Sequence, residues 1–493
     1  MANEEFKFKT DLIIPNNYYK ECLSIDYNIN DINQIITNIN GSDSLKKLKG
    51  LIGLRKVMLK EEEEKEEQKL LYNDANMLFD LLENYPQEFK YECLICLSCI
   101  ENYNLKYEQK IKNEPNDKII KIILHILEFS NEFNVDFLRV TLNYINLLIN
   151  NKDMIKKFET KKLYYSLKNL ITNNKYSNQF DIIGTCLEIL SQIFEIEEQI
   201  SENVEIILEL IMLLDDIIKK YESNNKDILN FSLKIFYSIT NYNIEKKSPT
   251  TQKIMNKILE IKILQKLINK IDKLDIENDR KEILFSLRII GNFAAMDDSF
   301  YTDKIIELNI LDKLKLFIQD KYHFNIRKET AWIISNIAAG SSAQIIKLYE
   351  NNYPEILIDI ILNGNEDKIK DNCLWALYNF SNISNKDYLN NLVEKGFIDI
   401  IINRLKIDTG DTLCCSLEAL NNILIKGKNN DPANFNIIES KVNELNILKE
   451  LKNFINVNQL SEICFNKAKA ILNNYFGIED INQFLNTNEV EIS

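Results

Sequence analysis

One helical pattern returns along most of this chain at nearly constant spacing, and it limits the fold more than any other feature. Aligned on one polar or small position, its eight copies are spaced by 47, 46, 46, 54, 44, 43 and 43 residues. The aligned position holds, in chain order, Cys99, Asn146, Gln192, Ser238, Asn292, Asn336, Asn379 and Asn422. A repeat of about 40 residues is typical of a solenoid built from two or three helices per unit.

The residue composition agrees with a chain made of helices alone. Apolar residues recur at helical period almost throughout, and the 6 Pro and 11 Gly of the 493 residues do not cluster. Gly291 and Gly340 lie near two of the repeated helices, which suits close packing inside a three-helix unit. We therefore expect an all-α fold, and specifically a right-handed armadillo-repeat superhelical solenoid rather than a HEAT array.

The chain divides into three parts by pattern. Residues 1–43 are expected to be an irregular N-terminal segment, residues 44–480 an array of about nine or ten repeats, and residues 481–493 an acidic tail. The array should begin with an amphipathic helix from Ser44 that ends in the solvated acidic run 61–67. The polar segment 241–252 should form a longer loop. A last helix should stop at Gly477 and cover the apolar end of the stack.

Both tryptophans of the chain occupy the same place in the repeat, four residues before an asparagine. The two pairs are Trp332 with Asn336, and Trp375 with Asn379. In the preceding copy these places hold Arg288 and Asn292. Residues four apart lie on one face of a helix, so the three helices are expected to form one groove that presents these side chains.

This groove has the chemistry to bind an extended basic peptide. A carboxamide both donates and accepts hydrogen bonds, so an Asn on each helix can hold one peptide unit of any sequence. A Trp face beside it can stack on Lys or Arg, and Asp298 and Glu329 supply carboxylates. The net charge of −14 suits a basic partner, although it also simply keeps a protein soluble.

Each of these residues also has an ordinary structural reading. A single Trp on an amphipathic helix usually belongs to the core, and the shared phase of the two pairs favours the groove instead. For Arg288 the alternative is an ion pair within the molecule.

The sequence contains few of the residues and motifs that enzymes or metal-binding proteins require. The chain has two histidines, His125 and His323, and no phosphate-binding, dinucleotide-binding or zinc-protease motif. Cys93, Cys96 and Cys99 are interpreted as buried thiols of an apolar helix, without a fourth ligand for zinc. We expect no catalysis, no cofactor and no metal. The N-terminus has no signal-peptide core and no stretch reads as a membrane span, so we expect a soluble intracellular protein in a reducing compartment.

Five segments resemble the importin α (karyopherin α) family, which carries proteins with nuclear localisation signals. LRIIGNFAAMDD, RKETAWIISNIAAG, DNCLWALYNFSN and SLEALNNILIKG resemble its sixth to ninth armadillo repeats, and KAILNNYFGIED resembles the segment that closes the last one. The resemblance implies a nuclear import adaptor that binds Lys/Arg-rich signals and is found in cytoplasm and nucleus. By the same resemblance a minor peptide site comprises Arg288, Asn292, Asp298, Glu329, Trp332, Asn336, Trp375 and Asn379.

The chain also departs from that family. Of the residues that form the family's major peptide site, only Asn146 is retained, and the Trp positions there fall at Ile95, Leu142 and Glu188. Asn372 stands where the family has an acidic residue. The resemblance implies importin β and an export receptor as partners, the latter near residues 475–480. However, the basic segment that importin β captures is reduced here to Lys7 and Lys9.

Two other functions remain open at this stage. The chain could be a general armadillo scaffold that binds another extended peptide. It could also be a regulatory subunit that holds an enzyme through its convex face. A preference for Lys and Arg in the bound peptide would distinguish the import adaptor from the general scaffold. Loss of binding on mutating Trp332, rather than a patch on the convex face, would distinguish it from the regulatory subunit.

Overall fold

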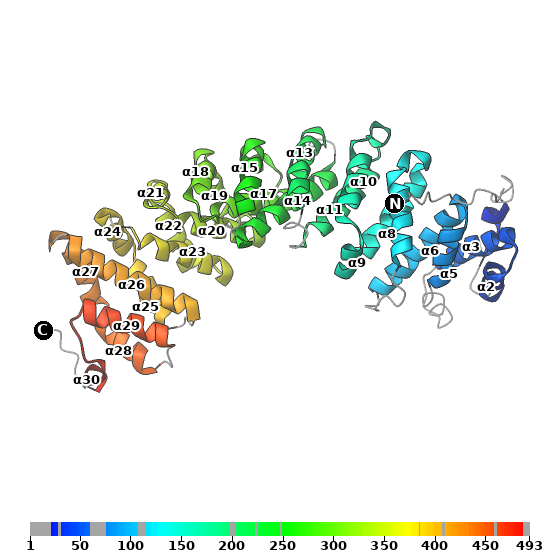
Figure 1. Cartoon of the computed structure of the whole chain (residues 1–493). Helices are drawn as coiled ribbons and strands as arrows, with labels where there is room; N and C mark the ends of the chain where they lie inside the picture. The colour runs from blue at the N-terminus through cyan, green and yellow to red at the C-terminus, as the bar shows by residue number, and fades with distance from the viewer. Residues whose placement is uncertain are drawn as a thin grey trace. The chain divides into compact units, whose positions relative to one another are not determined.

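The computed structural model describes residues 21–27, 31–59, 75–106, 115–196, 203–221, 225–246, 249–383, 385–406, 410–430, 432–457 and 461–486. These residues are helical with short turns and contain no β-strand, which confirms the all-α class (Figure 1). The chain forms two compact units, residues 1–242 and 243–493. The acidic run 61–67 lies outside the described residues. The right-handed sense of the superhelix stays a prediction.

The first unit is a stack in which α3, α6, α8 and α11 pack on one another in chain order, with α5, α7 and α10 against them. Leucine and isoleucine side chains fill the space between neighbouring helices; Leu142, Ile183 and Leu187 are at most 1% exposed. Its helices are α2 (Ile32–Asn40), α3 (Ser44–Leu59), α5 (Asn76–Asn84), α6 (Gln87–Lys106), α7 (Asp117–Glu128), α8 (Val135–Leu148), α9 (Lys152–Lys157), α10 (Thr160–Thr172), α11 (Phe180–Ile193), α13 (Val204–Tyr221) and α14 (Lys226–Lys246).

The second unit repeats a group of three helices, of which the third is buried deepest and packs on the third helix of the next group. These third helices are α17, α20, α23, α26 and α29 (Figure 1). The unit comprises α15 (Pro249–Glu260), α16 (Ile263–Lys270), α17 (Arg280–Ala294), α18 (Ser299–Glu307), α19 (Ile310–Phe317), α20 (Phe324–Ala338), α21 (Ser342–Glu350), α22 (Tyr353–Asn363), α23 (Asp367–Phe380), α24 (Lys386–Glu394), α25 (Phe397–Leu405), α26 (Gly410–Asn430), α27 (Pro432–Glu444), α28 (Ile447–Val457), α29 (Glu462–Asn474) and α30 (Ile481–Asn486).

A left-handed residue marks the corner between the first and second helix of each group. The residues with positive φ are Lys262, Asn309, Asn352, Gly396 and Asn446, with φ of 57°, 61°, 57°, 86° and 46°. Each stands two residues after a glutamate that ends the first helix, and four of these glutamates pair with a lysine three residues earlier at 2.7–3.1 Å. This Lys-x-x-Glu-x-Asn pattern is a second repeat signal, which the sequence analysis missed.

Three local expectations were wrong. Residues 32–40 form α2 inside the segment expected to be irregular, because Ile35 and Ile39 lie one turn apart and are both buried. Residues 241–246 continue α14 rather than forming a loop. Residues 481–486 form α30 inside the expected tail.

Other expected boundaries are confirmed. Helix α3 begins at Ser44, and α29 ends just before Gly477. Gly477 has φ of +70°, and its N–H donates to the Asn473 carbonyl while that of Ile478 donates to Leu472. This arrangement satisfies two carbonyls at the end of the helix.

Candidate functional site

The predicted groove residues lie on α17, α20 and α23, which pack side by side in the second unit (Figure 1). Trp332, Asn336, Trp375 and Asn379 are each half-buried, whereas their neighbours along the same helices are mostly buried. They therefore occupy one stripe at the edge of the core, as the helical spacing predicted.

Trp332 rests directly on the backbone of α17. A Cβ atom added at Gly291 would lie 2.3 Å from Cζ3 and 2.8 Å from Cε3 of the indole. The glycine thus makes room for a tryptophan from the next repeat. Gly340 instead makes room for Gln344, whose side chain completes the cap of α21. The expectation that both glycines serve close packing inside one repeat was wrong, because their neighbours are these two side chains.

The two asparagines differ in their hydrogen bonds. Asn379 donates from Nδ2 to the Ser335 carbonyl of α20 at 3.4 Å, which is a long bond. Within the described part of the chain, Nδ2 of Asn336 has no acceptor, although it is covered from solvent. A buried donor without an acceptor costs roughly 1–3 kcal/mol. Asn336 is therefore the stripe residue with a donor still to satisfy.

Arg288 and Glu329 hold each other across the α17–α20 contact. Arg288 Nε lies 3.1 Å from Glu329 Oε1, and Lys328 Nζ lies 3.8 Å from the same oxygen. Glu329 is 8% exposed. Of the two readings of Arg288, the structure has the ion pair. The expectation that Glu329 offers its carboxylate to a ligand is wrong for this state, because two cations of the same chain already neutralise it.

The remaining two predicted residues of this site are placed differently. Asn292 is 1% exposed, so its carboxamide is not presented at the surface as expected. Asp298 is exposed and caps α18, where Oδ1 accepts from the Phe300 N–H at 3.0 Å. Asp298 is therefore the predicted carboxylate that remains open to a cationic ligand.

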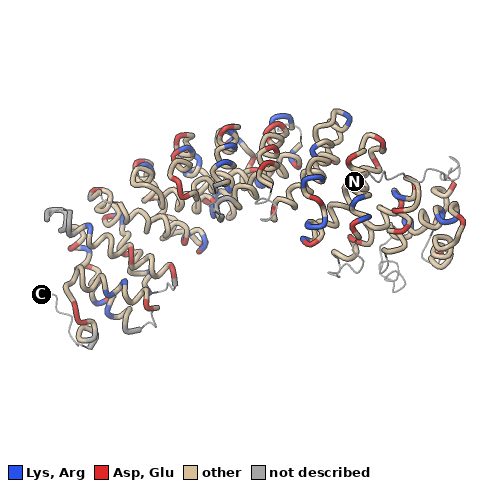
Figure 2. Tube along the Cα trace, in the orientation of Figure 1, with Lys and Arg blue, Asp and Glu red and all other residues tan. Residues whose placement is uncertain are grey.

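Two further groups border the stripe, of which the sequence had pointed to Asp371 and Asn372 but not to Lys426. Asp371 lies 3.4 Å from Arg404, and Asn372 donates to the Lys328 carbonyl at 3.4 Å. Beyond them, Lys426 donates to the carbonyls of Ser381 and Asn382 at 3.1 and 2.6 Å. Burial lowers the pKa of Lys426 below its usual range. Figure 2 shows basic and acidic residues interspersed along each unit.

In the first unit, side chains at the equivalent positions contact other side chains of the protein. Asn146 accepts through Oδ1 from Gln192 Nε2 at 2.9 Å. Leu142 is buried and Lys234 pairs with Glu195 at 2.7 Å. Asn146 thus already has a side-chain partner, whereas Oε1 of Gln192, like Nδ2 of Asn336, is buried without a hydrogen-bond partner among the residues described.

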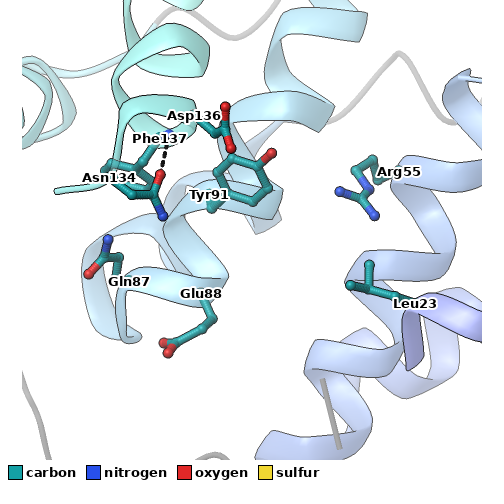
Figure 3. Close-up of a pocket in the computed structure, with 8 residues that line it drawn as sticks. All are labelled: Leu23, Arg55, Gln87, Glu88, Tyr91, Asn134, Asp136 and Phe137. Carbon is teal, nitrogen blue, oxygen red and sulfur yellow. Dashed lines mark hydrogen bonds between the residues drawn. The ribbon is translucent and has the colours of Figure 1, made fainter. Parts of the chain in front are cut away.

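A cavity of about 500 Å³ lies in the first unit where α3, α6 and α8 meet. Tyr91 and Phe137 form an aromatic wall with ring centroids 6.2 Å apart, and Arg55 is held by buried Glu92 at 3.0 Å. Figure 3 shows that Asp136 and Tyr91 lie on the side opposite Arg55. The lining residues are Leu23, Arg55, Gln87, Glu88, Tyr91, Asn134, Asp136 and Phe137. Because the cavity is lined by charges of both signs, its lining does not indicate which class of ligand it would bind.

Two of the three cysteines in the run are buried as interpreted from the sequence, whereas Cys99 is half-buried. Cys93 and Cys96 are fully buried, and burial raises the pKa of both thiols far above the usual range. Across the described ranges, no three or more His, Cys, Asp or Glu side chains come together as a metal site would require. None of the helices described is both long and apolar enough to cross a membrane.

Comparison with known proteins supports the fold. A crystallised engineered protein superposes on 90% of this chain and 99% of its own with a TM-score of 0.67, at 15% sequence identity. Together with the three-helix groups and their left-handed corners, this decides the architecture. The chain is an armadillo-repeat solenoid.

Sequence likeness to natural armadillo proteins is limited. The probable importin subunit alpha-A of Dictyostelium discoideum is 28% identical over 142 residues, which is 28% of this armadillo chain. The match spans only 25% of that relative's length. A designed armadillo repeat protein solved with the peptide (KR)4 superposes on 53% of the chain with a TM-score of 0.44 at 21% identity. No protein-family model matches the sequence.

Proposed function

We propose that this armadillo chain is a nuclear import adaptor that binds the Lys/Arg-rich localisation signals of cargo proteins along the stripe of α20 and α23. It would work in the cytoplasm and the nucleus as a binding protein rather than an enzyme. The observation that carries the proposal is the pair of half-exposed Trp–Asn combinations on adjacent helices, in which the Asn336 donor has no acceptor. The likeness to a probable importin subunit alpha-A supports it.

In the proposed adaptor each side chain of the groove has a role. Asn336 and Asn379 hold backbone carbonyls of the extended peptide, at about 1 kcal/mol net for each bond. Trp332 and Trp375 stack on the aliphatic stems and cationic heads of Lys or Arg, worth roughly 0.5–2 kcal/mol each. Asp298 attracts a cation at the α17 end. These four contacts add up to about 3–6 kcal/mol, so micromolar affinity also needs the attraction to Asp298 and further contacts along the extended peptide. An affinity in that range suits a carrier that must release its cargo.

Calorimetric titration tests the proposal. A ten-residue peptide rich in Lys and Arg should bind at micromolar concentration, and a peptide of equal length with Gln at those positions should not. Trp332→Ala and Asp298→Asn should each weaken binding several-fold. Binding of both peptides with equal affinity would contradict selection of basic signals.

A second function has its own support in the charges around the stripe. Glu329 is neutralised by Arg288 and Lys328, and Asn372 replaces an acidic residue. A less acidic groove also suits an armadillo scaffold that binds a neutral extended peptide. Equal binding of the Gln-substituted peptide, lost in Trp332→Ala, is the result that would favour this scaffold.

A further inference from the structure

The contact between Gly291 and Trp332 joins two successive repeats at the proposed groove. Gly291 lies inside α17, three residues before its last residue Ala294, and glycine within a helix is less favourable than alanine by up to about 1 kcal/mol. Its φ is not positive, so the backbone conformation does not require glycine there. The requirement comes from the indole, since a Cβ would lie 2.3 Å from Cζ3 and 3.0 Å from Cγ1 of Ile333.

The benzene edge of the Trp332 indole is the part that fills this space. Neither Cζ3 nor Cε3 can retreat as the end of a flexible chain would, because both belong to a rigid ring. Ile333 and Ile334, on either side of the same helix turn, are completely buried and fix α20 against its neighbours. The depth and tilt of the indole are therefore set by the absence of a side chain at residue 291.

The next repeat does not have this arrangement. The residue equivalent to Gly291, immediately before the stripe asparagine, is Ser335 in α20. Ser335 is 8% exposed, and its Oγ donates to the Trp332 carbonyl at 2.8 Å. A side chain thus occupies the place that is empty at Gly291. The helix that precedes Trp375 therefore lacks the glycine on which Trp332 rests.

We propose that Gly291 is a positioning residue of the peptide groove, which seats Trp332 against the backbone of α17 and so sets the ring face offered to a ligand cation. The role at the ligand rests on the function proposed above. It makes the Trp332 subsite rigid and distinct from the Trp375 subsite, because the residue equivalent to Gly291 on the helix before Trp375 is Ser335.

Tryptophan fluorescence tests the seating of the ring without any ligand. In a Trp375→Phe background, Trp332 is the only tryptophan, and its emission reports its own surroundings. Gly291→Ala should move the emission maximum to longer wavelength by several nanometres, because the ring is pushed out of the core. Gly184→Ala is the matched control, since a Cβ on that helical glycine meets nothing within 4 Å. It should leave the emission unchanged.

Peptide titration then tests whether the seating matters for binding. With both tryptophans present, Gly291→Ala should weaken the Lys/Arg-rich peptide about as much as Trp332→Ala does. Added to Trp332→Ala, it should weaken binding no further, because the ring it displaces is gone. Circular dichroism confirms folding of each variant, and Gly291→Ala with Trp332→Phe should recover thermal stability because the smaller ring leaves room for the methyl group.

The outcomes separate this inference from the proposed function. Unchanged emission in Gly291→Ala overturns the positioning role. An equal loss of affinity in the presence and absence of Trp332 also overturns it, because the glycine would then act only on the fold. If Gly291→Ala shifts the emission but the protein binds no basic peptide, the contact between Gly291 and Trp332 is confirmed. The proposal that this contact serves a basic ligand is then overturned.

Discussion

Asn336 and Asn379 occupy the same position in neighbouring repeats, yet they differ in their hydrogen bonds within the protein. Asn379 bonds to the preceding helix, while Nδ2 of Asn336 reaches no acceptor among the residues described. A side chain at this position that makes no hydrogen bond within the protein is expected to bond to a ligand. The difference between them can be measured.

Asn336→Ala should not lower the free energy of unfolding and should raise it by about 1 kcal/mol, because no hydrogen bond is lost and one unsatisfied buried donor is removed. The same change should weaken the basic peptide about five-fold, the equivalent of about 1 kcal/mol. Urea unfolding and calorimetry measure the two effects. A large loss of stability with unchanged affinity would make Asn336 a structural residue.

Lys90 is the buried cation of the first unit. It is 2% exposed, its Nζ donates to the Leu82 carbonyl at 2.6 Å, and burial lowers its pKa to about 8. Because the unfolded chain keeps the ordinary, higher pKa, the folded state binds fewer protons above pH 8. The contribution of Lys90 to stability therefore rises with pH between about 8 and 10.5.

Lys90→Met should remove this part of the pH dependence. Urea unfolding of wild type and variant between pH 7 and 10 gives the comparison, with Lys253→Met on α15 as a control at an exposed lysine. The expected result is a steeper rise of stability with pH in wild type than in Lys90→Met. Parallel curves would show that the pKa of Lys90 is not lowered.

At the scale of helices, repeat length and helix class followed from the spacing of apolar residues, while the details followed from contacts that the spacing does not contain. Helix α2 was missed because it is only nine residues long and has just two buried residues, Ile35 and Ile39. The burial of Asn292 and the pairing of Glu329 depend on where α17 and α20 cross. A one-dimensional pattern shows which face a residue shares, but not how far the next helix covers it.

The left-handed corners could have been found from the sequence. Asn309, Asn352 and Asn446 each follow a glutamate at the same distance, and Asn adopts positive φ more readily than most residues. Their spacing gives the repeat independently of the tryptophans. At this scale the corner is the element most sensitive to a single substitution.

Asn309 is exposed, so replacing it changes the backbone preference and little else. Asn309→Gly should keep or slightly raise the midpoint of thermal unfolding, because glycine adopts positive φ freely. Asn309→Val should lower stability by roughly 1–2 kcal/mol, since a branched side chain is strained there. Equal midpoints for the two variants would mean that the corner conformation contributes nothing to stability.

At the scale of the whole molecule, a solenoid needs each end of its stack covered. Helix α29 packs on α26 and buries Cys464, Ala468, Ile471 and Leu472. On α26 the residues Leu417, Leu420 and Leu424 are completely buried. The C-terminal helix therefore covers apolar surface that the preceding repeat cannot bury alone.

A chain ending at residue 457 should lose this cover. It should bind a dye for exposed apolar surface, such as anilinonaphthalene sulfonate, and unfold at lower temperature than the full chain. A chain ending at residue 486, which keeps α29 and α30, is the control. Identical dye binding by the two chains would show that α29 is not required as a cap.

Because Trp332 and Trp375 are the only tryptophans of the chain, its intrinsic emission reports directly on the proposed groove. The central measurement is a titration of wild type with a Lys/Arg-rich peptide at low salt, followed by this emission. The proposed adaptor predicts a saturable change in the micromolar range, the same affinity for Asn146→Ala, and a five-fold weaker affinity for Asn336→Ala. An emission that stays constant up to tens of micromolar, with no binding by calorimetry, would contradict the claim that this groove binds basic peptides.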